Sequence, residues 1–298
     1  MQFDIGCSAR RIRDLCVCKA HGEGKGEQQR PGCHATKVGS NALTITSATN
    51  TTSGTTLALG SVVLSGAGVL GNAGTVTINA GPVSGITPSN LIQLVNTTPS
   101  SVRLGGRPIT MNGGAIEIGA DGTAGSILEN IAGNALAINN AYNLITLIAD
   151  TNSGTRLSSD VALARANGAT LLVRGTNLGT SAPAVNVATL SFTAGTAPTV
   201  GQTGGAGAFN RAIIPWLIVD TSASGSGTSF GTYVNGTTGV VALNTATEMS
   251  TPAAAGTVVV NNNNRINAAG VTVGASVANL TNTQVNSLTF NTGGSLVV

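Results

Sequence analysis

The chain has 298 residues, of which 41% are hydrophobic but only 3% aromatic and 8% charged. Its net charge of +3 arises in residues 1–40, which hold seven Lys and Arg and four acidic residues, whereas residues 41–298 hold seven of each and are neutral. This distribution excludes the basic surface typical of proteins that bind nucleic acid or anionic lipid, and no apolar stretch is long enough for a membrane-spanning helix.

Residues 1–40 differ in composition from everything that follows. Their charge and the Gly-rich run at residues 22–27 predict a disordered tail, so we expect a tail at 1–40 and one repetitive β segment at 41–298. A mispredicted translation start explains the same discontinuity. No signal peptide is recognisable, because residues 1–40 lack an apolar core and a small-residue cleavage site.

All four cysteines and both histidines lie within residues 1–34. Cys16 and Cys18 are separated by one residue, whereas zinc ligands usually pair as Cys-x2-4-Cys. We therefore expect no metal site and no cofactor. Because no histidine follows His34, a Ser-His-Asp triad is excluded from the rest of the chain.

Short alternating segments begin after residue 40. Residues 42–46, 74–79 and 115–118 alternate apolar with small polar side chains, which is the period of a strand with one buried face. Within the second segment, Val76 and Ile78 are expected to face the core, and Thr75, Thr77 and Asn79 to face solvent. Gly and Asn between the segments predict turns.

The pattern changes in residues 141–250 and returns after them. Residues 143–149 and 169–174 are continuously apolar, which predicts strands buried on both faces. Residues 159–165 are compatible with a short helix, but we favour a strand or an irregular crossover. Short strands are then expected at residues 256–260, 270–274, 285–290 and 293–298. The apolar, uncapped last strand indicates a cut within a longer array.

Seven acidic residues are scattered over residues 41–298, without an Asp-x-Asp or Asp-Asp pair. They are Glu117, Asp121, Glu129, Asp150, Asp160, Asp220 and Glu248. We interpret them as turn, cap or surface residues rather than as the clustered acids of a glycosidase. Trp216 with Phe209, Phe230 and Tyr233 is compatible with a sugar-stacking platform, but core packing is favoured. Residues 119–125 are interpreted as a turn, not as a calcium repeat.

Many strands in succession without helices predict stacked coils of about 20–25 residues. Five segments occur in the order found in autotransporter-associated β-strand repeat proteins, at residues 170–179, 210–216, 230–233, 241–248 and 282–290. The chain resembles that family over most of residues 41–298. The resemblance implies a right-handed parallel β-helix, in a secreted or outer-membrane passenger region of a bacterium, with no catalytic residues.

The predicted function is therefore a structural passenger or stalk segment at the cell surface, displaying loops for adhesion or surface contact. Its expected partners are further repeats of the same protein and an unidentified surface or glycan ligand, with no nucleic acid. A carbohydrate-binding or carbohydrate-active β-helix protein is one alternative. An adhesin with a specific loop epitope in residues 195–240 is another.

Overall fold

The computed structural model describes residues 34–50, 52–71, 73–95, 102–119, 126–131, 135–192, 197–272, 284–291 and 293–297. All regular structure in these ranges is β, as predicted. None of the described residues belongs to a helix that could cross a membrane. The predicted disorder of residues 1–33 and the predicted turn at residues 120–125 fall outside the described ranges.

Three sheets make up the main body, and each is named here by its strands. Sheet A contains β1 (His34–Lys37), β3 (Gly54–Leu57), β5 (Val76–Asn79), β9 (Ile109–Asn112), β12 (Leu136–Ile138) and β15 (Ala164–Arg165), in that order. Sheet B contains β2 (Ala42–Ile45), β4 (Ser61–Leu64), β8 (Leu91–Val95), β10 (Ala115–Gly119), β13 (Tyr142–Ile148), β16 (Thr170–Gly175), β18 (Ile214–Asp220), β19 (Ser229–Tyr233) and β20 (Val240–Ala242). Sheet C contains β11 (Ile127–Asn130), β14 (Thr155–Ser159) and β17 (Ala188–Phe192).

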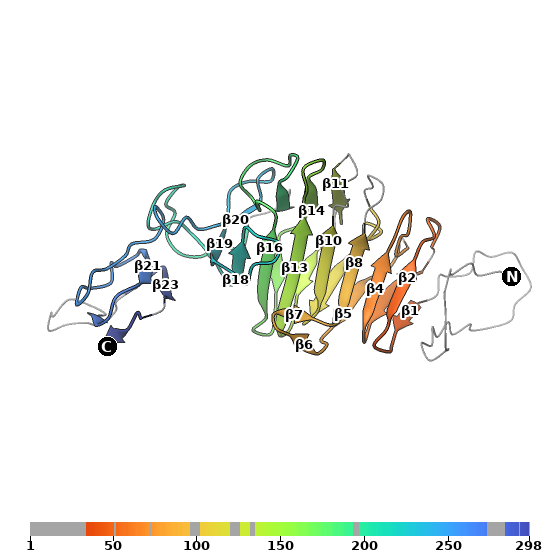
Figure 1. The fold of residues 1–298 in the computed structure, drawn as a ribbon, viewed down its shortest axis with the longest axis horizontal. Coiled ribbons are helices and arrows are strands. Elements are labelled where there is room, and N and C mark those ends of the chain that lie inside the picture. The colour runs from red at the N-terminus through yellow and green to blue at the C-terminus, as the bar shows by residue number, and fades with distance from the viewer. Residues whose placement is uncertain are drawn as a thin grey trace, which may run out of the picture.

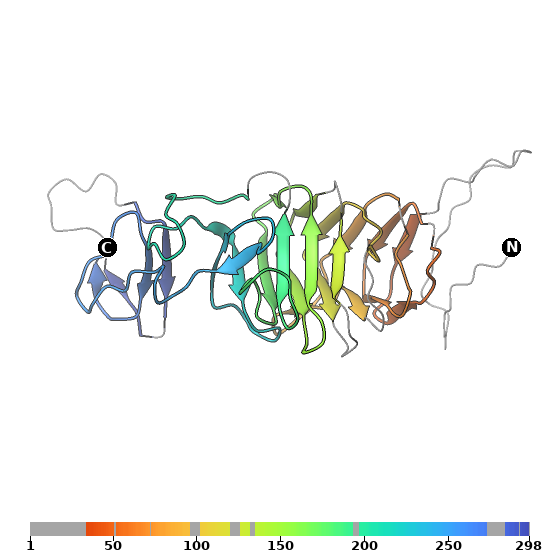
Figure 2. The same ribbon diagram turned by 90° about the horizontal axis from the view of Figure 1, so that it is seen from above.

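The chain visits these sheets in rotation, and its strands lie side by side along the long axis of the molecule (Figures 1 and 2). From β1 to β10 it alternates between sheets A and B, apart from β6 and β7, which form a separate two-stranded pair, and from β11 onward it also contributes strands to sheet C. Pairing is parallel throughout sheets A and C and in sheet B as far as β18. Paired residues are mostly about 20–33 positions apart, so many of the coils are longer than the expected 20–25 residues.

Side chains of like character stack in rows between the sheets. In sheet B one inward row is Val62, Ile92, Ile116, Ile145, Val173 and Val219. All of them belong to a single buried core shared with sheets A and C. Each such side chain contributes about 1.5–3 kcal/mol by leaving water. The predicted alternation in β5 is confirmed, because Val76 and Ile78 are buried while Thr77 and Asn79 are not.

A second row, in sheet A, corrects the expected boundary near residue 40. Lys37 lies in register with Leu57, and the row continues through Ile78, Met111 and Ile138 to Arg165. Lys37 is buried, and its ammonium donates to the carbonyls of Val38 and Gly39. Residues 34–37 are therefore the first strand of sheet A rather than tail, since main-chain pairing outweighs their polar composition.

The parallel arrangement ends at β18. The next two strands, β19 and β20, pair antiparallel and cover that end of the core. Tyr233 stacks on Phe192 with ring centroids 5.6 Å apart, and its hydroxyl donates to the Phe192 carbonyl. Trp216 is 8% exposed, in the main core, with the Arg165 guanidinium 5.9 Å from its ring centroid. Core packing of Trp216 is thus confirmed.

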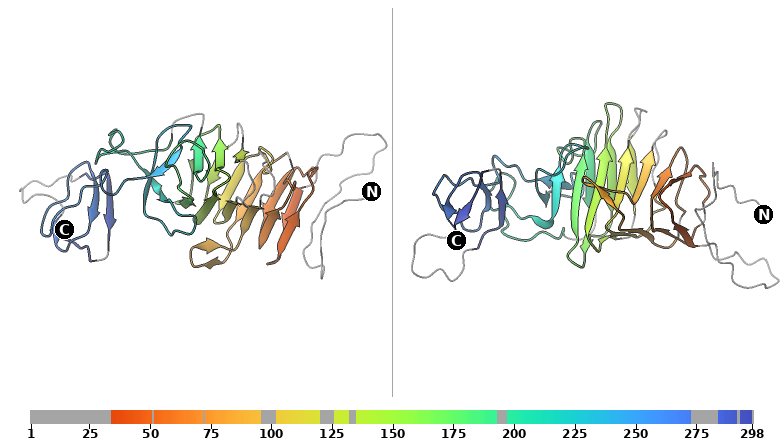
Figure 3. Two further views of the ribbon diagram at one scale, coloured as in Figure 1. Left: turned by 45° about the horizontal axis from the view of Figure 1, so that its top comes forward. Right: turned by 60° about the horizontal axis from the view of Figure 1, so that its bottom comes forward.

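The most C-terminal part has a small core of its own, formed around Val258, Ile266 and Val271. Its strands are β21 (Asn263–Ile266) paired with β23 (Ser287–Phe290), and β22 (Val271–Thr272) paired with β24 (Leu296–Val297). Figure 3 shows this part, in blue, at the opposite end of the molecule from β1 and β2. The strand expected at residues 256–260 is only an isolated bridge at Thr257.

Two other predictions concern residues 141–175. Strands β13 and β16 are buried on both faces over most of their length, as expected from their continuous apolar sequence. Residues 159–165 are not helical: β14 ends at Ser159, an irregular segment follows, and β15 begins at Ala164.

Candidate functional site

The outward face of sheet B carries two adjacent rows of contrasting chemistry. One row is apolar and consists of Leu91, Ala115, Leu144, Leu172 and Ile218. The neighbouring row is polar and consists of Gln93, Glu117, Thr146, Arg174 and Asp220. Sheet B therefore has an apolar stripe on its outside as well as its inside, which explains why its central strands are continuously apolar in sequence.

A short hairpin covers one part of the outer apolar row. Its strands β6 (Val83–Ser84) and β7 (Thr87–Pro88) pair antiparallel. The Tyr142 hydroxyl, from β13, donates to the Ile86 carbonyl at 2.9 Å and so holds the hairpin to the sheet. Ile86 and Tyr142 pack against buried Ala115 and Leu144. The hairpin is thus anchored by one hydrogen bond and a small apolar cluster.

The loop at residues 221–228 forms the opposite wall. The Asp220 carboxylate accepts hydrogen bonds from the amides of Ser222 and Gly227, each at 2.9 Å. Arg174 donates to the Gly225 carbonyl at 3.3 Å and to the Thr146 hydroxyl at 3.0 Å. Side chains of the polar row therefore fix this loop beside the apolar row.

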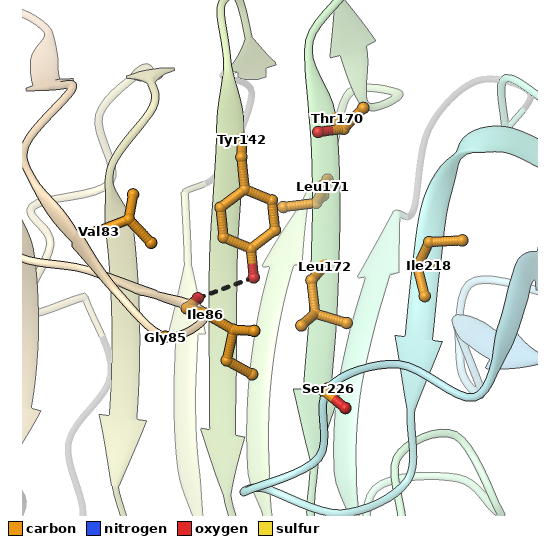
Figure 4. A pocket seen from close by; sticks show the side chains of 9 residues that line it. All are labelled: Val83, Gly85, Ile86, Tyr142, Thr170, Leu171, Leu172, Ile218 and Ser226. Carbon is orange, nitrogen blue, oxygen red and sulfur yellow. Dashed lines mark hydrogen bonds between the residues drawn. The ribbon is translucent and has the colours of Figure 1, made fainter.

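An open groove of about 450 Å³ lies between the hairpin and the loop (Figure 4). Its lining residues are Val83, Gly85, Ile86, Tyr142, Thr170, Leu171, Leu172, Ile218 and Ser226. Figure 4 shows the Tyr142 ring face-on between the hairpin and β16. The lining is uncharged and mainly aliphatic, with hydroxyl groups on Thr170 and Ser226. Such a surface suits the binding of an uncharged group.

Tyr142 is the titratable residue of the groove. Burial raises the pKa of its phenol, and the positive charge of Arg174 partly opposes that shift. The phenol therefore stays neutral around pH 7 and acts as the hydrogen-bond donor to Ile86. The hydroxyl of Tyr142 therefore holds the hairpin in place, while its ring contributes apolar surface to the groove.

Other buried charges hold turns rather than line the groove. Both oxygens of Glu129 accept main-chain amides, from Arg103 at 3.0 Å and Leu104 at 3.1 Å. Burial raises the pKa of Glu129, against the lowering effect of those amides and of the Arg103 charge. Arg107 donates to the carbonyls of Leu70 and Ala73, and burial lowers its pKa to about 10. Nothing in the sequence around these residues distinguished them from surface charges.

Asp150, Glu248 and Glu117 have the turn-holding or surface roles predicted for the acidic residues. Asp150 accepts the amides of Asn152 and Ser153, and Glu248 accepts those of Gly207 and Asn244. Glu117 lies on the outside of sheet B and accepts from Gln93 at 2.7 Å. Asp121 falls outside the described residues.

The aromatic residues considered as a stacking platform do not share one surface. Trp216 is in the main core and Tyr233 is stacked on Phe192. Phe209 lies 44% exposed in the loop between β17 and β18. Sequence reasoning did not identify Tyr142, because it lies within an apolar strand and its hydrogen-bond partner Ile86 is 56 residues away in the chain.

Metal-binding residues were expected nowhere, and the cysteines lie outside the described ranges. His34 is described, and its ring bonds to the Thr56 hydroxyl at 2.8 Å. Within the described ranges there is no group of three or more His, Cys, Asp or Glu placed to hold a metal ion.

Comparisons with protein-family models, with curated proteins and with solved structures found no match for the chain.

Proposed function

We propose that residues 34–220 form a right-handed parallel β-helix that works as a rigid stalk or passenger segment of a secreted or outer-membrane bacterial protein. The observation that carries this proposal is the unbroken parallel register of sheet B from β2 to β18 over one continuous core. Each layer contacts only its neighbours, so length and stiffness increase layer by layer. Such a body places surface features at fixed positions.

The displayed feature is the groove on the outside of sheet B. Its two walls are held by Tyr142, Arg174 and Asp220 through hydrogen bonds to the main chain. A surface whose loops are already ordered loses little conformational entropy on binding. This supports a role in adhesion or surface contact, with the stack as support and the groove as contact area.

Surface exposure is tested by cysteine labelling on intact cells of the source organism. The described residues contain no cysteine, so the four at positions 7, 16, 18 and 33 are replaced by Ser and one is introduced in the loop. Ser226→Cys, at an exposed position, is expected to react with a membrane-impermeant maleimide. Ser229→Cys, at a position 5% exposed, is the matched control and should stay unlabelled.

Labelling of Ser226→Cys only after lysis would contradict the proposed location. Equal labelling of both variants on intact cells would mean that the stack is not folded there. In purified protein the same pair checks the fold independently of location, because Ser229→Cys should react only after denaturation.

A further inference from the structure

A second cavity, of about 360 Å³, lies where the loop before β18 meets the C-terminal part. Its lining residues are Gly201, Gln202, Asn261, Gln284, Val285 and Asn286. Four of these six have side-chain amides and none is charged. The volume is within the range of about 300–1,000 Å³ that small-molecule sites occupy.

Hydrogen bonds of Asn286 hold the walls of this cavity together. Its Nδ2 donates to the Arg211 carbonyl at 2.7 Å and to Asn263 Oδ1 at 2.8 Å, while its Oδ1 accepts from the Gln202 amide at 3.3 Å. The main-chain N–H of Asn261 donates to the main-chain carbonyl of Gln284 at 2.8 Å. Three segments distant in sequence are thus fixed in place, so the cavity is preorganised.

The close approach of the loop depends on Gly201. Its φ is 100°, and a Cβ built there would lie 1.5 Å from Asn286 Oδ1. A glycine adopts that φ without strain and leaves the space that Asn286 occupies. The loop wall is therefore determined by backbone geometry, and the amide groups project from a fixed frame.

Three amide side chains at the cavity remain available to a ligand. Gln202, Asn261 and Gln284 are exposed, and their side chains make no hydrogen bond within the described part of the chain. Each primary amide offers two N–H donors and one carbonyl acceptor. Hydroxyl groups are complementary to this mixture because they both donate and accept. Arg211, whose carbonyl accepts from Asn286, has its guanidinium paired with Glu248 at 2.5 Å.

We propose that this amide-lined cavity binds an uncharged saccharide, a role beyond that of a stalk. The amides of Gln202, Asn261 and Gln284 bind ring hydroxyls, and Val285 contacts a C–H face of the sugar. An ionic ligand is disfavoured, because burying its charge here without a partner costs free energy.

The test uses the whole chain and a defined set of probes: maltotriose, cellotriose, mannotriose and chitotriose, with trigalacturonate as the charged comparison. Titration calorimetry is expected to detect at least one neutral trisaccharide. Gln202→Met and Gln284→Met keep side-chain length but lose the amide, and each should weaken binding about five-fold. Asn261→Gly removes the third amide and tolerates the backbone there, where φ is 63°.

Asn41→Met is the matched control, since Asn41 is an exposed amide at the far end of the stack beside β2. It should leave affinity unchanged. All variants should keep the thermal unfolding profile of the parent, because the replaced side chains are exposed. The proposal is overturned if no neutral probe binds up to about 10 mM, if only trigalacturonate binds, or if the Gln202→Met, Gln284→Met double variant binds as well as the parent.

Discussion

Asn90 and Asn143 show how single polar side chains determine the turns between sheets A and B. Each is fully buried just before, or at the start of, a strand of sheet B. Asn90 accepts from the Gly60 amide at 2.9 Å and donates to the carbonyls of Ala58 and Asn79. Asn143 accepts from the Gly113 amide at 2.8 Å. These amides satisfy main-chain groups that would otherwise be buried without partners.

The inward and outward positions of β5 should respond very differently to charge. Ile78 is fully buried between Leu57 and Met111, so Ile78→Asp places a carboxylate in an apolar row and should cost about 4 kcal/mol. Thr77→Asp, on the other face of the same strand, should cost less than about 1 kcal/mol. Urea unfolding of both variants measures the difference. Equal losses would mean that the assigned register is wrong.

At the scale of elements, the Glu248 carboxylate contributes several of the hydrogen bonds that hold the loop before β18 in place. Glu248 accepts from the Gly207 amide at 2.8 Å, from Arg211 at 2.5 Å and from the Asn244 amide at 2.8 Å. Burial by itself raises the pKa of Glu248, but these hydrogen bonds and the Arg211 charge outweigh it, so the pKa is lowered below its ordinary 4.5. The ionised form is thus the one that the fold stabilises.

Acid should therefore weaken these hydrogen bonds. Because the folded-state pKa of Glu248 is lowered, its stabilising contribution is complete above the ordinary value of 4.5 and is lost as pH falls through the folded-state value. Glu248→Gln should cost about 2 kcal/mol at pH 7 and should flatten the acid side of the stability–pH curve. The curve is measured by urea unfolding between pH 3 and pH 7.

Glu117→Gln provides the control for that prediction. Glu117 also accepts a side-chain hydrogen bond, from Gln93, but it lies on the outside of sheet B and a Gln there can still accept. We expect a stability–pH curve close to that of the parent. If Glu248→Gln behaved like Glu117→Gln, the hydrogen bonds of Glu248 would contribute nothing to stability.

At the scale of the whole molecule, two apolar cores are joined by polar contacts. The core around Val258, Ile266 and Val271 is separate from the main core. The two parts meet through the hydrogen bonds of Glu248, Asn263 and Asn286. Segments that share an apolar core unfold cooperatively, and these two parts do not share one. They should therefore unfold as two distinct units.

Calorimetry of the whole chain should resolve two transitions, the lower belonging to the C-terminal part with its smaller core. Val271→Ala should lower the midpoint of the first transition only. Leu94→Ala, in the main core, should lower the midpoint of the second transition only. Each substitution should reduce the unfolding free energy of its own unit by about 2–4 kcal/mol. A single transition shifted by both substitutions would show that the molecule unfolds as one unit.

Much of this architecture was evident from the sequence alone. The all-β class and the positions of several strands, such as β2, β5 and β10, followed from side-chain alternation, because a period of two is a local property that each strand carries in its own residues. The facing of Val76 and Ile78 followed for the same reason, whereas the double burial of β13 and β16 followed from their continuous apolar sequence. The structural, turn-holding roles of Asp150 and Glu248 were also predicted from their scattered positions.

What the tertiary structure decided is which residues meet. No local pattern specifies which segments pair with one another. Three features depend on that pairing: the burial of Lys37 in sheet A, the antiparallel pairing of β19, and the contact of Tyr142 with Ile86, 56 residues away in the chain. The same holds for the amide-lined cavity, whose walls come from three distant segments. Alternation determines which face of a strand is buried, but it does not determine which strand lies beside it or in what register. Those depend on the loop lengths and on how the side-chain rows pack in the core.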